Sequence, residues 1–283
     1  GGINRRRLEN NANEARNVYD VNRVQIPKLA VRGPGSDAKV ALIYCDRNND
    51  VLPIKFRYGS VTAPDNISNG LGHNVDSYGI DSDPNDSGSA SGYEVVANTA
   101  SEHHQGGGYA AVGLTSTNRA VVVWYDAAKS QLVYSYRDIG TSYTEPAAGA
   151  TDRKTSEWQA NAVEIDGGAP LYVDLVIDDE DGLHIGYYSS GNGGVRYAYL
   201  APGKVNGSTK PATSDFKIAT VDTYMNPGTF LKMGVRKENN KQVPYISYYH
   251  NGFYGSANAA RIAWLKDGLV KTDTAVKNGV VSN

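Results

Sequence analysis

The chain has 283 residues, a formal net charge of -2 and 40% hydrophobic residues. This near-neutral balance gives no general attraction to nucleic acid or to an anionic membrane surface, so neither partner is expected. The single cysteine, Cys45, excludes an intrachain disulfide. No stretch approaches the ~18 apolar residues of a membrane-spanning helix, so we also expect no membrane span.

Tyrosine and glycine are the two prominent residue types. There are 20 tyrosines against 4 phenylalanines and 3 tryptophans, and 31 glycines. A tyrosine side chain has an apolar ring with a polar tip, which suits half-buried strands. The glycines and a mean hydropathy of -0.46 indicate many turns. The composition therefore favours an all-β, tyrosine-rich chain.

The chain begins with an arm, residues 1–24, which carries the basic run Arg5-Arg6-Arg7. After it, one three-strand pattern occurs four times, as in "LYVDLVI", "DDEDG", "LHIGYYS", "SGNGG", "VRYAYL". The four copies run from Pro27 to Arg57, Tyr109 to Arg137, Leu171 to Leu200 and Phe230 to Leu265. Further strand-like segments follow three of them: "YEVVANT" from Tyr93, "WQANAVEI" from Trp158 and "FKIATVD" from Phe216.

One aromatic position recurs in the second strand of each copy. The spacings between these residues are 80, 63 and 61, so the unit has about 62 residues and the first copy contains an insertion. Four short strands repeated in tandem are typical of β-propeller blades. Large rings would fill the wedge between radial sheets, opposite small residues such as Gly186 and Ala263. The aligned second-strand residues are Tyr44, Trp124, Tyr187 and Tyr248, and the third-strand residues are Phe56, Tyr136, Tyr199 and Trp264.

The predicted fold is therefore an all-β propeller of about four blades over residues 25–283, with part of a larger propeller as the alternative. The last blade needs a fourth strand from elsewhere. One candidate is the C-terminal "LVKTDTAV"; the other is "NVYDVN" of the arm, at residues 17–22, which would strap the first blade to the last.

The stretch "DEDGLHIGYYSSGNGGVRYAY", within Asp178 to Tyr199, resembles the repeat of bacterial extracellular β-propellers. Such repeats occur in secreted or lipid-anchored surface proteins and in sialidase-like propellers, so the resemblance implies a location outside a bacterial cell. The aspartate box of sialidases, S-x-D-x-G-x-x-W, is absent from the sequence. No glycosidase residues are therefore transferred to this chain.

The insertion in the first unit, at about residues 59–92, is rich in Gly, Ser, Asn and Asp. Long insertions on a rigid scaffold often carry function. Its hydrogen-bonding groups and one aromatic ring predict a partner-binding face formed by Tyr78, Asn69 and Asn74. Three acids in the same insertion are the candidate ligands of a calcium ion, although their spacing departs from that of an EF-hand loop. They are Asp81, Asp83 and Asp86.

First strands of propeller blades line the central channel. Asp174 and Lys232 occupy the same place in two first strands, with Lys28 and Ala111 in the other two. These charges could pair with one another or bind an ion or small anion. His184 is expected to be a packed or hydrogen-bonded residue, and "DDEDG", residues 178–182, is expected to be a hairpin turn.

The sequence contains no Ser-His-Asp spacing, P-loop or dinucleotide motif, and no catalytic residue is assigned. The favoured function is a non-catalytic, secreted or cell-surface scaffold that binds protein or glycan, so the chain is not expected to be an enzyme. One alternative is a subunit of a surface assembly, formed by self-association or by a partner chain that completes the ring. The other alternative is a sialidase-like, glycan-active enzyme.

Overall fold

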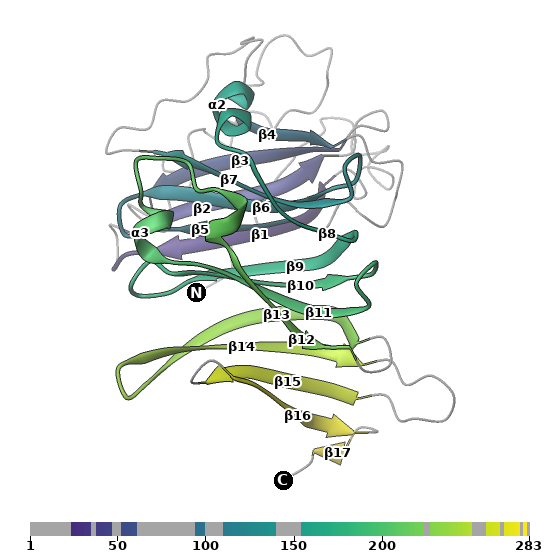
Figure 1. Cartoon of the computed structure of the whole chain (residues 1–283). Coiled ribbons are helices and arrows are strands. Elements are labelled where there is room, and N and C mark those ends of the chain that lie inside the picture. Colours follow the sequence, from purple (N-terminus) through teal and green to yellow (C-terminus); the bar gives the residue numbers. More distant parts are fainter. Residues whose placement is uncertain are drawn as a thin grey trace, which may run out of the picture.

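The computed structural model describes residues 24–34, 38–46, 52–60, 94–99, 110–139, 154–223, 227–250, 259–266, 269–277 and 280–281. Almost all of these residues lie in antiparallel strands, which form four sheets (Figure 1). The predicted partner-binding and calcium residues of the insertion lie outside the described residues, as do residues 1–23 of the arm.

Each sheet is built from strands that follow one another in the chain, and we number the sheets as blades 1 to 4. Blade 1 contains β1 (Val24–Arg32), β2 (Lys39–Asp46), β3 (Leu52–Ser60) and β4 (Glu94–Thr99). Blade 2 contains β5 (Ala110–Leu114), β6 (Arg119–Asp126), β7 (Gln131–Asp138) and β8 (Val163–Gly167). Blade 3 contains β9 (Pro170–Ile177), β10 (Leu183–Ser189), β11 (Gly194–Leu200) and β12 (Lys217–Asp222).

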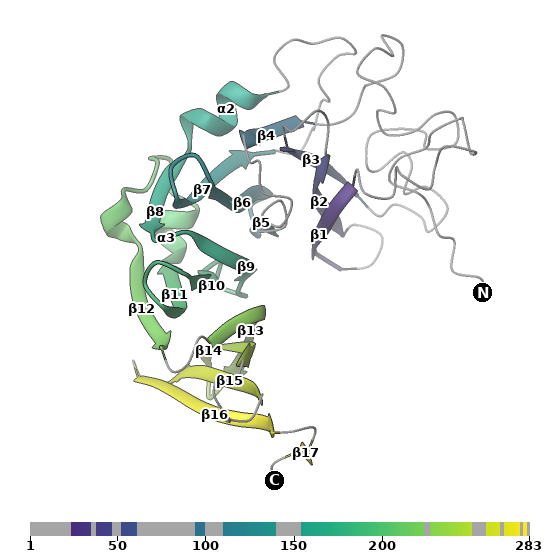
Figure 2. The same cartoon turned by 90° about the vertical axis from the view of Figure 1, so that its right-hand side faces the viewer.

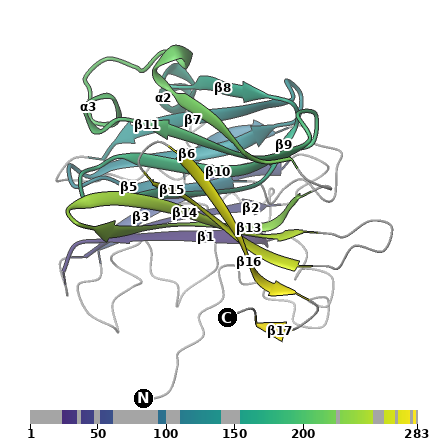
Figure 3. The same cartoon turned by 60° about the horizontal axis from the view of Figure 1, so that its bottom comes forward.

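Blade 4 contains five strands rather than four. They are β13 (Pro227–Glu238), β14 (Lys241–His250), β15 (Ala259–Lys266), β16 (Leu269–Lys277) and the short β17 (Val280–Val281). The fourth position is thus occupied by β16, the C-terminal candidate, and β17 pairs along its outer side (Figure 3). The rival strap from residues 17–22 lies outside the described residues.

The four blades fan out around one axis, so the predicted all-β propeller is confirmed (Figure 2). The first strands, β1, β5, β9 and β13, lie innermost, whereas β8, β12 and β16 lie at the periphery. A separate core fills each of the three spaces between successive blades. No helix among the described residues is long and apolar enough to cross a membrane.

The repeated second-strand aromatics, which we call the wedge aromatics, are all 5% exposed or less. They are Tyr44, Trp124, Tyr187 and Tyr248. Glycine permits the close approach of blades on their facing sides. A Cβ atom added to Gly186 of blade 3 would lie 3.0 Å from Leu231 Cδ2 and 3.2 Å from Met233 Sδ of blade 4. Large aromatic rings at some positions and glycines at others therefore let the sheets pack closely around one axis.

The segment after β7 differs from the prediction, because Trp158 lies in a helix rather than a strand. Helix α2 (Thr155–Ala160) precedes β8, and it places the Trp158 side chain, fully buried, against blade 1. The indole Nε1 donates a hydrogen bond of 2.9 Å to Glu94 Oε2, and Glu94 also pairs with Arg137. The free energy gained by burying this ring and by hydrogen bonding to the buried Glu94 carboxylate outweighs the preference of the local sequence for a strand. Two further helical elements among the described residues are α3 (Pro202–Val205) and the 3-10 turn η4 (Thr213–Asp215).

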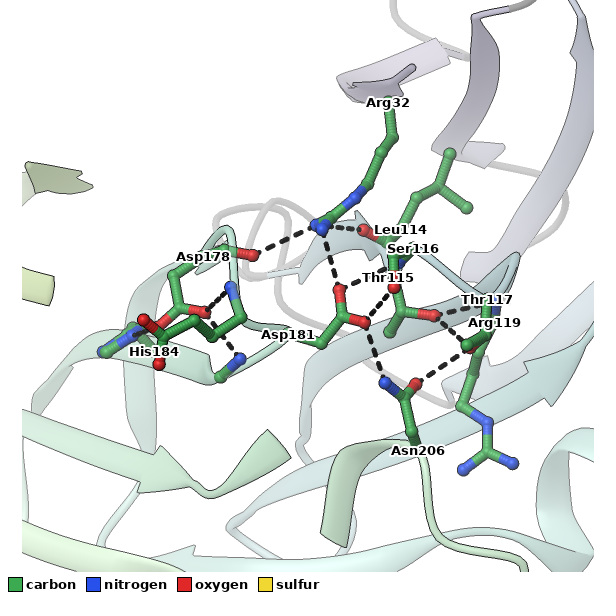
Figure 4. Close-up of polar contacts among 12 residues, drawn as sticks. Arg32, Leu114, Thr115, Ser116, Thr117, Arg119, Asp178, Asp181, His184 and Asn206 are labelled. Atoms are coloured by element: carbon green, nitrogen blue, oxygen red, sulfur yellow. Dashed lines mark hydrogen bonds and ion pairs between the residues drawn. The ribbon is translucent and has the colours of Figure 1, made fainter. Parts of the chain in front are cut away.

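A polar network around Asp181 connects three blades at one end of the inner strands (Figure 4). Arg32, at the end of β1, pairs with Asp181 Oδ1 at 2.8 Å and donates to the carbonyl oxygens of Leu114 and Asp178. Asp181 accepts further hydrogen bonds from the backbone and side chain of Ser116 and from Asn206. The acidic turn is a hairpin turn, as predicted, but it also links blade 3 to blades 1 and 2.

Truncation of a wedge aromatic should destabilise the whole propeller. We expect Tyr187→Ala to lower the free energy of unfolding by about 3–5 kcal/mol, because it leaves a cavity in the core between blades 2 and 3. Tyr187→Phe, which removes only the hydrogen bond to Asp166, should cost about 1 kcal/mol. Half-buried Tyr125→Ala is the matched control. Urea denaturation measures all three; equal losses for Tyr187→Ala and Tyr125→Ala would contradict the wedge role.

The network around Asp181 should make stability depend on pH. Burial raises the pKa of Asp181, but hydrogen bonds from Ser116 and Asn206 and the charge of Arg32 outweigh it and hold the pKa below its usual value. The stabilisation is therefore complete above about pH 4, the pKa of an unfolded aspartate, and is lost as pH falls through the lower folded pKa.

Asp181→Asn should cost about 1.5–3 kcal/mol at pH 7, because it removes hydrogen bonds to a charged group. This deficit should shrink as the pH falls below about 4, where the parent loses the same charge. Exposed Asp179→Asn, in the same turn, should change stability little at any pH. A deficit that stays constant down to about pH 2 would show that the carboxylate charge of Asp181 contributes nothing.

Candidate functional site

Three inner strands share a register shift of the β-bulge type, in which two residues face one on the neighbouring strand. In β1 the shift lies between Gln25 and Lys28. In β9 it lies between Leu171 and Asp174, and in β13 between Thr229 and Lys232. The residues opposite are Tyr44, Tyr187 and Tyr248, all wedge aromatics. Bulges bend a strand and redirect its side chains, so the same device recurs around the axis.

The residue that ends each bulge is one of the charged axial residues predicted from the sequence. Lys28 Nζ lies 3.5 Å from Asp174 Oδ1, and Lys232 Nζ lies 3.8 Å from Asp174 Oδ2. The backbone N–H of Met233 donates to Asp174 Oδ2 at 3.0 Å. The structure thus brings Asp174 and Lys232 together with Lys28, from blades 3, 4 and 1. We call these three residues the axial triad.

The axial triad carries a surplus positive charge, because two ammonium groups share one carboxylate. The side chains of Lys28 and Asp174 are 19% and 15% exposed, whereas that of Lys232 is 64% exposed. Burial lowers the pKa of Lys28, and the nearby Lys232 lowers it further, while the charge of Asp174 acts in the opposite direction. The exposed Lys232 is therefore available to an anionic ligand, and Lys28 gives up its proton more readily than an ordinary lysine.

Two aromatic residues lie inside the bulges of β9 and β13, two residues before the charged ones. Tyr172 and Phe230 have φ angles of 51° and 54°, in the left-handed region that bulky residues rarely adopt. Their ring centroids are 5.9 Å apart, and the ring of Tyr249 lies 6.5 Å from that of Phe230. Phe230 is 76% exposed. We call Tyr172, Phe230 and Tyr249 the aromatic platform.

Folding stability does not explain why an exposed phenylalanine is held in a strained backbone conformation. Left-handed backbone for such a residue costs on the order of 1–3 kcal/mol, and an exposed ring gains little in return. Strain of this kind persists where the surrounding structure enforces it, and it is concentrated at functional sites. The aromatic platform and the axial triad together form the candidate functional site, which we call the axial site.

Sequence reasoning found the axial triad but missed the aromatic platform. Phe230 and Tyr172 occupy matching positions at the start of their repeat copies, which is a signal that the sequence contains. Alternation alone would have placed both rings on a blade face, because the bulges that redirect them cannot be seen in the sequence.

The other predicted binding residues and calcium ligands, Asn69, Asn74, Tyr78, Asp81, Asp83 and Asp86, lie outside the described residues, and their roles stay predictions. Within the described part of the chain, no three His, Cys, Asp or Glu side chains are grouped to hold a metal ion.

The insertion connects to blade 1 away from the axial site. Its first described neighbour, Ser60, pairs with Lys39, which in turn pairs with Arg32 at the far end of β1. The aromatic platform lies near the beginnings of β9 and β13, the opposite end of the inner strands. The described attachment point of the insertion at Ser60 and the aromatic platform thus lie at opposite ends of the inner strands.

Comparison with known proteins gives structural neighbours only, since no family model and no curated protein matches the chain. An exo-β-1,3-galactanase from Clostridium thermocellum matches 89% of this chain at 9% identity, with a TM-score of 0.40. A GH43 β-1,3-galactosidase matches 87% at 9% identity and 0.43, and a puromycin hydrolase 92% at 12% identity and 0.42. This chain spans 49%, 44% and 34% of those three chains.

These neighbours are enzymes, and two of them are glycosidases. Against them, the predictions of a non-catalytic scaffold and of a chain that is not an enzyme are wrong, and the alternative of a glycan-active enzyme agrees better. The scaffold prediction relied on the absence of local catalytic motifs, and such motifs do not report side chains that the fold brings together from different blades. With TM-scores below 0.5 the likeness assigns no activity to this chain, whose function must be argued from its own side chains.

Removal of the strained ring should leave the fold intact. Phe230→Gly relieves the left-handed strain, and this gain offsets the lost ring contacts with Tyr172 and Tyr249, so the free energy of unfolding should change by no more than about 1 kcal/mol. The matched control is the next residue, buried Leu231, whose change to Ala should cost about 2–5 kcal/mol. Urea denaturation compares the two. A loss above about 2 kcal/mol for Phe230→Gly would mean that the ring stabilises the fold.

Proposed function

We propose that this chain is a glycan-active enzyme, or the propeller part of one, and that the axial site binds an acidic sugar. The observation that supports this function is the surplus lysine charge beside an exposed aromatic platform. An aromatic face packs against the apolar C–H face of a sugar ring, and an exposed lysine pairs with a sugar carboxylate. Neither group needs to move far, because bulges fix both of them on rigid strands.

The aromatic platform and Lys232 would contact different parts of such a sugar, the ring face and the carboxylate. Phe230 and Lys232 belong to the same strand, two residues apart, and Tyr172 and Asp174 have the same relation in β9. A sugar ring that rests on Phe230 therefore has its substituents close to the axial charges. Asp174 lies between the two lysines, and the exposed Lys232 ammonium group is the cation that meets the sugar carboxylate while Lys28 is neutral.

Lys28 is the candidate general base. Burial and the nearby Lys232 lower the pKa of Lys28, so a larger fraction of this lysine is neutral and able to accept a proton than of an ordinary lysine. The hydrogen on the carbon next to a sugar carboxylate is acidified when Lys232 neutralises that carboxylate. Lys28 Nζ takes this proton, a C=C double bond forms, and the C–O bond at the next carbon breaks. The departing oxygen takes a proton from water, and the hydroxide that remains takes the proton from Lys28, which restores the base and completes an elimination.

The test uses the whole chain and a panel of soluble acidic polysaccharides, with neutral polysaccharides in parallel. We expect new reducing ends from an acidic polymer, together with ultraviolet absorbance of the conjugated double bond. Lys28→Gln should lower kcat by about 10²–10⁴-fold, the usual contribution of a general base. Lys129→Gln, at an exposed pair with Glu164, is the control and should leave the rate unchanged.

The rate should rise with pH as Lys28 loses its proton and should level off above its lowered pKa. Reducing ends without ultraviolet absorbance would show hydrolysis instead of elimination. Cleavage of no acidic polymer, or full activity of Lys28→Gln, would overturn the proposed function.

A location outside a bacterial cell is a further proposal. Its support is the resemblance of the Asp178 to Tyr199 stretch to repeats of surface propellers, and a polymeric glycan is a substrate met outside cells. Contacts with a protein partner, or with a second copy that would complete the ring, stay predictions.

A further inference from the structure

A second cavity lies between blades 3 and 4, at the end of the inner strands opposite the aromatic platform. Its volume is about 570 Å³, a size that admits a small ligand. The turn after β9 contributes Asp178 and Glu180, the turn after β13 contributes Asn240, and the start of β14 contributes Lys241. Side chains of β10, β11, β12, β14 and β15 form the rest of the lining. We call this cavity the inter-blade pocket.

A buried polar chain forms one wall of the inter-blade pocket. His184 Nε2 lies 2.9 Å from Asp178 Oδ2, and His184 Nδ1 lies 2.6 Å from Tyr197 Oη. A carboxylate can only accept, so Nε2 carries the hydrogen and Nδ1 accepts from the tyrosine hydroxyl. Burial lowers the pKa of His184, although Asp178 opposes this, so the ring is neutral near pH 7. The wall is thus fixed, and both ring nitrogens are occupied.

An aromatic face and a donor without a partner complete the recognition surface. The half-buried ring of Tyr199 lies 5.1 Å from the ring of His184 and lines the pocket. Gln242, another lining residue, has a buried Nε2 with no hydrogen-bond partner among the described residues. A buried donor without an acceptor costs about 1–3 kcal/mol, and rotation of the Gln242 side chain toward a ligand oxygen in the pocket would relieve that cost.

The charges that line the pocket are balanced. Two carboxylates, Asp178 and Glu180, are accompanied by two ammonium groups, Lys217 and Lys241. A ligand with a net charge would be attracted by the two side chains of opposite charge and repelled by the two of like charge. A neutral polyhydroxyl ligand can form hydrogen bonds with all four. The inter-blade pocket therefore differs from the axial site, where a positive charge is in surplus.

From these observations we propose that the inter-blade pocket is a second binding site, for a neutral sugar residue. The sugar packs its C–H face on Tyr199 and accepts a hydrogen bond from Gln242 Nε2, while its hydroxyl groups bond to exposed Glu180 and Asn240. This site does not depend on the axial site, because the two lie at opposite ends of β9 and β13. A polymeric glycan could then be held by this pocket whatever reaction takes place at the axis.

Calorimetric titration of the whole chain with neutral oligosaccharides of galactose, arabinose, xylose and glucose tests this site. We expect one family to bind, with Tyr199→Ala weakening the affinity about tenfold. Gln242→Met, which keeps the side-chain length but removes the donor, should weaken it about three- to tenfold. The control Lys232→Met changes the axial site alone and should leave neutral-sugar affinity unaltered.

Three outcomes would contradict the proposed binding site. It is wrong if no neutral oligosaccharide binds, if affinity survives both Tyr199→Ala and Gln242→Met, or if Lys232→Met abolishes binding. Circular dichroism of each variant confirms that the sheets are intact. Failure of this test leaves the cleavage of acidic polymers at the axis unaffected, and failure of that cleavage leaves neutral-sugar binding unaffected.

Discussion

Radial packing is the constraint on which the other features of this molecule depend. Flat sheets that share one axis are crowded at their inner edges and separated at their outer edges. Three of the wedge aromatics, Trp124, Tyr187 and Tyr248, belong to the cores of the three spaces between blades. Gly186 allows the side chains of Leu231 and Met233 to reach blade 3. The same is true of Gly113, where a Cβ atom would lie 2.7 Å from Leu175 Cδ1.

The bulges of the inner strands follow from this crowding. Each stands opposite a wedge aromatic, where the innermost strand must accommodate a large ring on its neighbour. An extra residue in the strand supplies the room, and it also turns side chains toward the axis. Packing and recognition are therefore not independent here. Tyr187, in the core between blades 2 and 3, and Tyr248, in the core between blades 3 and 4, stand opposite the bulges that position Tyr172 and Phe230.

The sequence was sufficient for the architecture because the repeat is carried by large side chains at fixed spacing. Copies 63 and 61 residues apart defined the unit, and the equivalent first-strand positions identified Asp174 and Lys232. The helix at Trp158 could not be predicted, since a long-range contact with Glu94 decides its conformation. Bulges were equally invisible, because register depends on pairing between strands and not on composition.

The acidic turn between β9 and β10 has a consequence for the order of folding. Asp178 accepts hydrogen bonds from the backbone N–H groups of Glu180 and Gly182, 2.8 Å and 2.7 Å away, and pairs with His184 six residues along. These contacts need no other blade, so they can form while the rest of the chain is still unfolded. Asp181, in contrast, pairs with Arg32 only after the long stretch of chain between these two residues has closed into a loop. One turn thus contains both contacts that are local in sequence and a contact that requires another blade to be in place.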